Sequence, residues 1–346
     1  MMSGKRILAA LVGALALSVP AAPTVNDLKV TAIPPWGLAL DYTVEGATAA
    51  DVDRLLYVTV TDGAKTCFAR NLVGATNCVN GAHRVYWNLA ADGLTATVTN
   101  GTVTAGYGVY CVINVSAGSS ATSYPVTYLA AEPSGGWTDE YKTSKIVLRR
   151  IYMPSGTSYY AGVFEITEAQ WARVMGGSNT STKPKGSVSY NEIRGAAGTY
   201  DWPKSDEVSS TSFMGRLRQK TGLTTLDLPS EEEWEYAARA GVTTKWICGN
   251  GETGLGDYAW YKTNSGDATH SVGTRRANAW GLYDVHGNVW ECCLDRYSSG
   301  DNNRRVLRGG AYDSDVSPCA FAYRHYPQDL WIRGVGFRLF CRPRSK

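Results

Sequence analysis

Apolar and polar side chains alternate along the first third of the chain. Between about residues 25 and 131, apolar residues occupy every second position in short runs, and turn-forming pairs such as Asp62-Gly63 and Asp92-Gly93 separate these runs. Period-two alternation between turn signals is typical of antiparallel strands, and a succession of such strands indicates a β-sandwich. The expected strands cover residues 28–33, 38–44, 55–61, 84–89, 107–115 and 124–129.

We interpret residues 24–130 as an N-terminal all-β sandwich of the Ig-like or fibronectin-like type. Within it, Cys67 and Cys78 are expected to close one loop by a disulfide. No set of residues in this sequence segment has the spacing of metal ligands or of a nucleophile with its base. Residues 131–144 contain Pro133-Ser134-Gly135-Gly136 and are expected to form a linker.

The pattern changes after Lys145, where period-two runs give way to short helical signals. Thr167 and Gln170 form a capping box that opens a helix, and Gly176 is placed to end it. A second helix is expected around 213–220 and a third from Ser230 to about Gly241, with three glutamates in its first turn. The remainder is rich in Gly, Asn and Trp, so residues 145–343 are expected to be an α+β domain with little regular secondary structure.

The N-terminal residues have the order of a secretory signal peptide. Lys5 and Arg6 precede an uncharged apolar run over residues 7–19, which leads into the small residues Ala21 and Ala22. The alternative is an uncleaved anchor, but the apolar run is too short to cross a bilayer comfortably. We therefore expect residues 1–22 to direct export to the periplasm, the cell surface or the medium, where disulfides can form.

Composition changes this picture in only one respect. The 34 basic and 31 acidic residues of the 346-residue chain leave a formal net charge of +3, without long runs of one sign. Such a balance lacks the electrostatic surface that binding to nucleic acid or to an anionic membrane needs. Partners must therefore be inferred from individual sites.

Several separated motifs resemble those of the formylglycine-generating enzyme, or sulfatase-modifying factor, family of the bacterial type. They are Phe164-Glu165-Ile166-Thr167 with Trp171, LPSEEEWEYAAR over 228–239, NAWGLYDVHGNVWE over 278–291, Arg308-Gly309-Gly310-Ala311-Tyr312, and Gly336-Phe337-Arg338. Their shared order makes the resemblance specific. It implies a C-type-lectin-like α+β fold stabilised by calcium over residues 145–343.

A calcium site is expected at the turn after Asp284. Its carboxylate, the carbonyls of Gly287 and Val289, and the carboxylate of Glu291 are hard oxygen donors within eight residues. The four positions also match the second calcium site that the resemblance implies. The alternative is that the two carboxylates cap turns or pair with arginines.

The oxidase site that the resemblance implies is incomplete. Active members hold copper(I) with two cysteines and use dioxygen to convert a sulfatase cysteine to formylglycine; here the positions fall on Ser314 and Cys319, and Ala311 replaces the family serine. A protonated hydroxyl is a poor ligand for copper(I), which prefers thiolates. Cys319 would be the catalytic cysteine only in an active enzyme.

Cys319 has a structural alternative that the resemblance also suggests. Relatives often carry a cysteine at the position of Cys293, so a Cys293–Cys319 disulfide is expected in preference to a reactive thiol. Cys248 and Cys341 are a further possible pair.

Three functions remain open at this stage. The favoured one is an exported recognition module for a protein or glycan ligand, without copper oxidase activity. Its expected ligand surface comprises Tyr312, Asp313, Phe321, Tyr323, His325, Tyr326 and Trp331. The alternatives are an active formylglycine-generating oxidase that uses copper and a sulfatase substrate, and a surface binding protein that is either retroelement-diversified or of the adhesin type.

Overall fold

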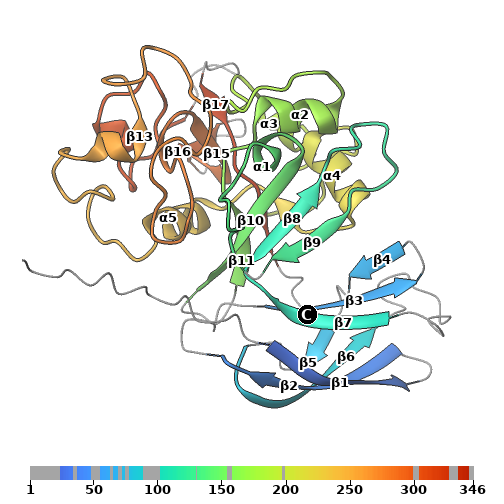
Figure 1. Cartoon of the computed structure of the whole chain (residues 1–346). Coiled ribbons are helices and arrows are strands. Elements are labelled where there is room, and N and C mark those ends of the chain that lie inside the picture. The colour runs from blue at the N-terminus through green and yellow to red at the C-terminus, as the bar shows by residue number, and fades with distance from the viewer. Residues whose placement is uncertain are drawn as a thin grey trace, which may run out of the picture.

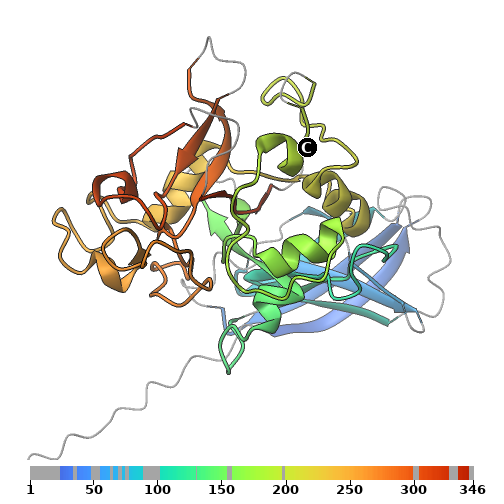
Figure 2. The same ribbon diagram turned by 90° about the horizontal axis from the view of Figure 1, so that it is seen from above.

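The structure is a computed structural model that describes residues 24–33, 37–47, 55–62, 65–68, 72–74, 78–88, 102–129, 131–153, 158–196, 199–298, 304–326 and 334–342. The expected signal peptide over 1–22 lies outside these ranges. The green central part of the chain lies above the blue N-terminal strands and beside the orange to red C-terminal part in Figure 1, and Figure 2 shows the same parts from above.

Two antiparallel sheets form the N-terminal part. One has the order β1-β2-β6-β5 and the other β4-β3-β7. Apolar side chains at alternate positions, such as Leu40, Tyr42 and Val44 of β2, turn inward and share a core with Val58 of β3. The strands are β1 (Thr24–Ile33), β2 (Gly37–Glu45), β3 (Leu55–Asp62), β4 (Lys65–Phe68), β5 (Leu72–Gly74), β6 (Gly81–Asn88) and β7 (Thr102–Gly108). The Ig-like or fibronectin-like type stays a prediction.

The last two strands expected in that sandwich belong to another sheet. β8 (Tyr110–Asn114) and β9 (Val126–Leu129) join β10 (Lys145–Tyr152), β11 (Ser158–Gly162), β12 (Leu226–Asp227) and β18 (Phe340–Cys341) in the order β12-β18-β11-β10-β8-β9. Leu148 of β10 pairs with Cys111 of β8. Alternation predicted these two strands, but it carries no information about which strand each would pair with.

The central sheet is covered on both faces, which explains its nearly continuous apolar strands. Cys111, Ile113 and Leu148 belong to the main core, whereas Tyr110 and Val147 pack on the opposite face. The segment expected to be a linker takes part in this packing. It contains α1 (Glu140–Thr143), and its buried Trp137 contacts Tyr110 edge-on at 4.9 Å between ring centroids.

The three predicted helices are confirmed. They are α2 (Glu168–Met175), α4 (Phe213–Thr221) and α5 (Glu231–Arg239). Capping boxes at Thr167 and Ser230 start α2 and α5, and the left-handed Gly222 ends α4. A short helix that was not predicted, α3 (Tyr190–Ile193), begins with its own capping box at Ser189.

Short elements and long loops make up the rest, as expected for an α+β domain of few helices; its lectin-like type stays a prediction. The elements are η3 (Leu255–Asp257), β13 (Ala259–Trp260), β14 (His286–Gly287), β15 (Trp290–Arg296), β16 (Arg305–Arg308), η4 (Ser317–Cys319) and β17 (Val335–Gly336). β15 pairs antiparallel with β16 and parallel with β17.

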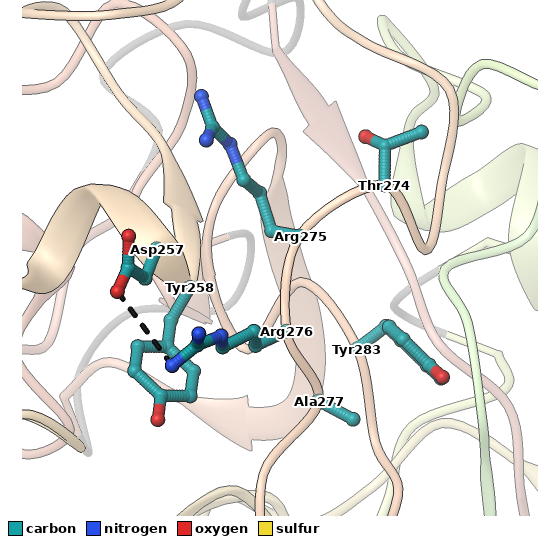
Figure 3. A pocket seen from close by; sticks show the side chains of 7 residues that line it. All are labelled: Asp257, Tyr258, Thr274, Arg275, Arg276, Ala277 and Tyr283. Atoms are coloured by element: carbon teal, nitrogen blue, oxygen red, sulfur yellow. Dashed lines mark ion pairs between the residues drawn. The ribbon is translucent and has the colours of Figure 1, made fainter. Parts of the chain in front are cut away.

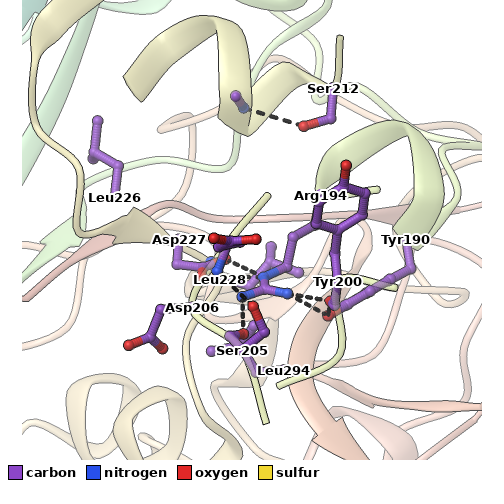
Figure 4. A network of polar contacts seen from close by, with 12 residues as sticks. Tyr190, Arg194, Tyr200, Ser205, Asp206, Ser212, Leu226, Asp227, Leu228 and Leu294 are labelled. Atoms are coloured by element: carbon purple, nitrogen blue, oxygen red, sulfur yellow. Dashed lines mark hydrogen bonds and ion pairs between the residues drawn. The ribbon is translucent and has the colours of Figure 1, made fainter. Parts of the chain in front are cut away.

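Buried arginines hold several of these loops. The fully buried Arg194 donates to Asp227 at 3.0 Å and to the carbonyl oxygens of Tyr200 and Ser205 (Figure 4). Arg218 donates to Oδ2 of the same Asp227 carboxylate at 2.9 Å. One carboxylate thus pairs with guanidinium groups from two segments, and the remaining donors of Arg194 satisfy loop carbonyls that no strand pairs.

Candidate functional site

The turn from Asp284 to Asn288, which includes β14, has an unusual backbone that brings several polar groups together. Asp284, Gly287 and Asn288 all have positive φ, at 56°, 77° and 61°. A Cβ on Gly287 would lie only 2.0 Å from the carbonyl oxygen of Trp260, so only glycine fits this close approach. Asn288 anchors the turn, because its side chain donates to Glu165 at 2.7 Å and accepts from the backbone of His270 at 3.0 Å.

Three buried carboxylates gather at this turn around one arginine. Glu165, Asp284 and Glu291 are each at most 2% exposed, and Arg338 donates to Glu291 at 2.7 Å. Burial first, and then the charges of Asp284 and Glu291, raise the pKa of Glu165 well above its ordinary range. Burial also raises the pKa of Asp284 to about 6, although the backbone amide of Gly273 and the charge of Arg338 oppose the rise.

The calcium ligands expected here differ in how well they fit an ion. Asp284 Oδ2 accepts from the Gly273 amide at 2.7 Å, while Oδ1 is buried with no hydrogen-bond partner among the described residues. Glu291 instead accepts from Arg338 and from Trp234 Nε1, each at 2.7 Å. This is the pairing with an arginine that the sequence offers as the alternative to calcium binding. Within the described ranges, no three His, Cys, Asp or Glu side chains are placed to hold a metal. Asp284 is therefore the residue on which a calcium site would depend.

Both residues at the expected copper-ligand positions are buried. Ser314 is 9% exposed, and its Oγ accepts from the Ala311 amide at 2.9 Å. Cys319, at the end of η4, is fully buried and donates to the Asp315 carbonyl at 3.6 Å. Burial raises the pKa of the Cys319 thiol to about 12, and the charge of Asp315 adds to the effect. This thiol is therefore protonated at neutral pH.

The expected Cys293–Cys319 disulfide is not formed. Both thiols are unpaired, because Cys293 packs with Trp234 in one apolar cluster and Cys319 packs with Trp246 in another. Cys248 and Cys341 are likewise separate thiols. The side chain of Cys67 lies outside the described residues, so its pairing with Cys78 stays a prediction.

The expected ligand surface is only partly accessible. Phe321 is fully buried, with its ring 4.4 Å from that of His286, so it belongs to the core. Asp313 is exposed, Tyr323 is 39% exposed, and Tyr312, His325 and Tyr326 are half-buried. Aromatic content alone could not separate core from surface in this segment. Trp331 lies outside the described residues.

Tyr312 lines a pocket of about 360 Å³ that other segments complete. The remaining lining residues are Glu168, Pro184, Gly186, Ser187, Ala268, Thr269 and Gly334. Ser265 donates to the Tyr312 carbonyl at 2.7 Å, and the Tyr312 amide donates to the Asn288 carbonyl at 2.9 Å. These bonds fix the backbone of Tyr312 against the turn that Asn288 anchors.

Sequence reasoning missed most residues of this pocket. Glu168 was seen only as the first residue of a helix, and Ser187 and Thr269 carry no motif. The segment after α2 folds back beside Ile166, where the Lys185 amide donates to the Ile166 carbonyl at 2.7 Å. This contact brings Ser187 close to Glu168 in the pocket. A contact between segments this far apart has no local signal in the sequence.

Known proteins resemble the part of the chain that contains this turn and this pocket. The sequence profile described as Sulfatase-modifying factor enzyme 1-like domain matches residues 155–343. A chaperone protein LppX from Paenibacillus barcinonensis is 25% identical over 221 residues, 52% of this chain and 77% of that protein. Among solved structures, Treponema denticola variable protein 1 is 24% identical, with a TM-score of 0.44 over 57% of this chain and 96% of that one.

Of two further relatives, one is named as an enzyme and the other as an inactive enzyme. A formylglycine-generating enzyme from Mycobacterium tuberculosis is 40% identical over 159 residues, 34% of this chain and 52% of that protein. An inactive C-alpha-formylglycine-generating enzyme 2 from Bos taurus is 39% identical over 95 residues, 25% of this chain and 32% of that protein. The chain therefore spans about a third to a half of the length of these two relatives. In the described part of the chain, no helix is long and apolar enough to cross a membrane.

Proposed function

Because the chain belongs to the sulfatase-modifying factor enzyme 1-like family, we propose that its family domain recognises a ligand and does not act as a copper oxidase. The observation that carries this proposal is Ser314, which stands at the position of the first copper-ligand cysteine. The names of the relatives do not decide the question, since both active and inactive proteins are among them.

The donors at this position do not fit copper(I). The Ser314 hydroxyl is a hard, neutral oxygen and already accepts a hydrogen bond from the Ala311 amide. The Cys319 thiol is held protonated by burial, whereas copper(I) takes soft thiolate ligands, and a pair of them is needed to hold it. One protonated thiol beside an alcohol cannot replace that pair.

We place ligand recognition at the pocket beside Tyr312. It offers one carboxylate from Glu168, hydroxyls from Ser187 and Thr269, and the half-buried Tyr312 ring. A carboxylate accepts hydrogen bonds from the hydroxyl groups of a ligand, and protein hydroxyls both donate hydrogen bonds to them and accept from them. An aromatic ring packs on the apolar face of a sugar. A volume of about 360 Å³ lies at the lower end of the range for small-molecule sites. The chemistry therefore favours a saccharide or another hydroxyl-rich ligand.

Calcium and export complete the proposal. An ion bound through Asp284 and the carbonyls of Gly287 and Val289 would add a positive charge beside the buried Glu165 carboxylate, while Glu291 stays paired with Arg338. The unpartnered Oδ1 of Asp284 supports this proposal. The basic, apolar and small-residue order of residues 1–22 supports export.

The test of activity uses a peptide with the sequence Cys-x-Pro-x-Arg, copper(I) and dioxygen. We expect no loss of roughly 18 Da, the mass change for conversion of a thiol to an aldehyde, and no stoichiometric copper(I) on the wild-type protein. Ser314→Cys tests whether one ligand is all that is missing, and Ser317→Cys, an exposed residue of the same loop, is the matched control. Turnover by the wild-type protein would refute the proposal.

The test of recognition is a glycan array followed by titration of the best saccharide. Glu168→Gln keeps the shape of the pocket but removes its charge, and Tyr312→Ala removes its aromatic wall. We expect each to weaken binding at least about tenfold, since charged hydrogen bonds and aromatic walls dominate such sites. The exposed Glu232→Gln on α5 is the control and should bind as the wild type does. Equal binding by all variants would place the site elsewhere.

A further inference from the structure

A second and larger pocket lies in the family domain. Its volume is about 640 Å³, and Figure 3 shows the residues that line it: Asp257, Tyr258, Thr274, Arg275, Arg276, Ala277 and Tyr283. It shares no lining residue with the pocket beside Tyr312. Arg276 runs from its loop toward Asp257 and Tyr258, whereas Arg275 points away from it along another side of the pocket (Figure 3).

Arg275 is held in place by stacking and not by an acidic partner. Its guanidinium carbon lies 3.6 Å from the ring centroid of Trp260, whose other face stacks on His270 at 3.7 Å. Trp260 Nε1 donates to Thr274 Oγ1 at 2.8 Å, which ties the stack back to the loop. Among the described residues Arg275 makes no ion pair, and its Nε has no hydrogen-bond partner. Its donors are therefore positioned but not used.

Arg276 is only loosely neutralised. Its Nη1 lies 3.7 Å from Asp257 Oδ2, beyond hydrogen-bond distance, and both side chains are more than half exposed. Its backbone amide donates to the Asp257 carbonyl at 2.9 Å, so the residue itself is fixed while its side chain faces solvent. An exposed pair at this separation contributes little, so an incoming anion can compete with Asp257 for this guanidinium.

The loop that carries both arginines cannot relax easily. Gly273 has a φ of 69°, and its amide donates to the buried Asp284 carboxylate at 2.7 Å. A Cβ at Gly273 would lie 2.4 Å from the ring of Phe164, so the loop passes tightly over that ring. The two arginines are thus presented from a rigid support, which reduces the entropy lost on binding.

We propose that this pocket binds a small organic ligand through an oxyanion group, a phosphate, sulfate or carboxylate, which Arg275 holds and toward which the exposed Arg276 side chain turns from Asp257. Guanidinium groups match these anions with parallel N–H donors, and the half-buried Tyr258 ring offers a surface for the body of the ligand. The two arginines and Asp257 leave a net charge of +1 in the pocket, which favours an anion over a neutral ligand. The site is independent of the recognition pocket proposed above.

The test is calorimetric titration of the full chain with inorganic phosphate at constant ionic strength and neutral pH. We expect saturable binding that is weakened at least about tenfold in Arg275→Gln and in Arg276→Gln, since each removes a charge-assisted donor pair. Arg275→Lys keeps the charge but loses the planar fork and should bind more weakly than the wild type. Lys262→Gln removes the same charge from an exposed position outside the pocket and should change nothing.

Acetate and sulfate, titrated in parallel, identify the kind of oxyanion preferred, and chloride is the control for general charge effects. If Arg275→Gln fails to fold because its stack on Trp260 is lost, Arg276→Gln still tests the proposal, since that side chain is exposed. The proposal is overturned if phosphate shows no saturation, if chloride binds equally, or if folded Gln variants bind phosphate as tightly as the wild type.

Discussion

His286 should make the folded protein sensitive to mild acid. Its ring is fully buried on β14 between two loops, where Nδ1 donates to the Cys319 carbonyl at 2.7 Å and Nε2 accepts from the Ile247 amide at 3.2 Å. Because Nε2 accepts a hydrogen bond, the ring must be neutral and protonated on Nδ1. Burial lowers the pKa of His286 to about 4, although the Cys319 carbonyl opposes this shift.

The sign and size of the effect follow from this lowered pKa. Above pH 6.5 the ring is neutral in both states, and its contribution to stability is fully present. As the pH falls below 6.5, His286 becomes protonated in the unfolded chain but stays neutral in the folded protein. The free energy of unfolding therefore falls until about pH 4. With about 1.4 kcal/mol for each tenfold step in affinity for the proton, the loss is about 2 kcal/mol by pH 5 and roughly 3 kcal/mol at its limit.

The measurement is urea unfolding of the wild type and of His286→Gln between pH 8 and pH 5, with calcium held constant. Glutamine cannot titrate, so the stability advantage of the wild type should shrink by about 2 kcal/mol over this range, whatever its size at pH 8. Other titrating groups act on both proteins and cancel in the difference. His83→Gln in the N-terminal sheet is the matched control. A pH-independent difference between wild type and His286→Gln would refute this account.

Two further predictions concern stability. Excess chelator should lower the melting temperature, since an ion at a hundred times its Kd stabilises the native state by about 2.7 kcal/mol; Asp284→Asn should abolish this response, and an unchanged midpoint in the wild type would count against the site. Asp227→Ala should lower the free energy of unfolding by roughly 3 to 5 kcal/mol in urea titrations, because it leaves the buried Arg194 without its counter-charge. Asp41→Ala, which breaks the exposed pair with Arg84, is the control and should change little; equal losses in both would contradict the burial argument.

The elements that the sequence predicted well are those that depend on neighbours a few residues away. Thr167 with Gln170 and Ser230 with Glu233 form hydrogen bonds across three residues, so the starts of α2 and α5 could be read directly. The family motifs and the serine at position 314 are likewise properties of the chain itself. The pairing of β8 and β9 with β10 was not predicted, because alternation is the same whichever strand lies alongside.

Cysteines and aromatic residues show where such local reasoning stops. Cys293 and Cys319 are compatible with a disulfide on composition and compartment alone, yet they pack in different apolar clusters. Phe321 and Tyr323 are both aromatic and two residues apart, but one is fully buried and the other 39% exposed. In a segment without a helix or strand, no regular spacing of apolar residues shows which side chains face the core, and the residue type alone does not show it either.

The sequence by itself determined three of the helices, the family motifs and the serine at position 314, because each depends on residues that lie close together in the chain. Only the tertiary structure decided which strands share a sheet, which thiols are buried, and where the two pockets lie. The physical reason is that Glu168, Thr269 and Tyr312, or Asp257 and Arg276, meet only through contacts between distant segments. Such contacts are selected by the packing of the whole core and leave no pattern along the chain.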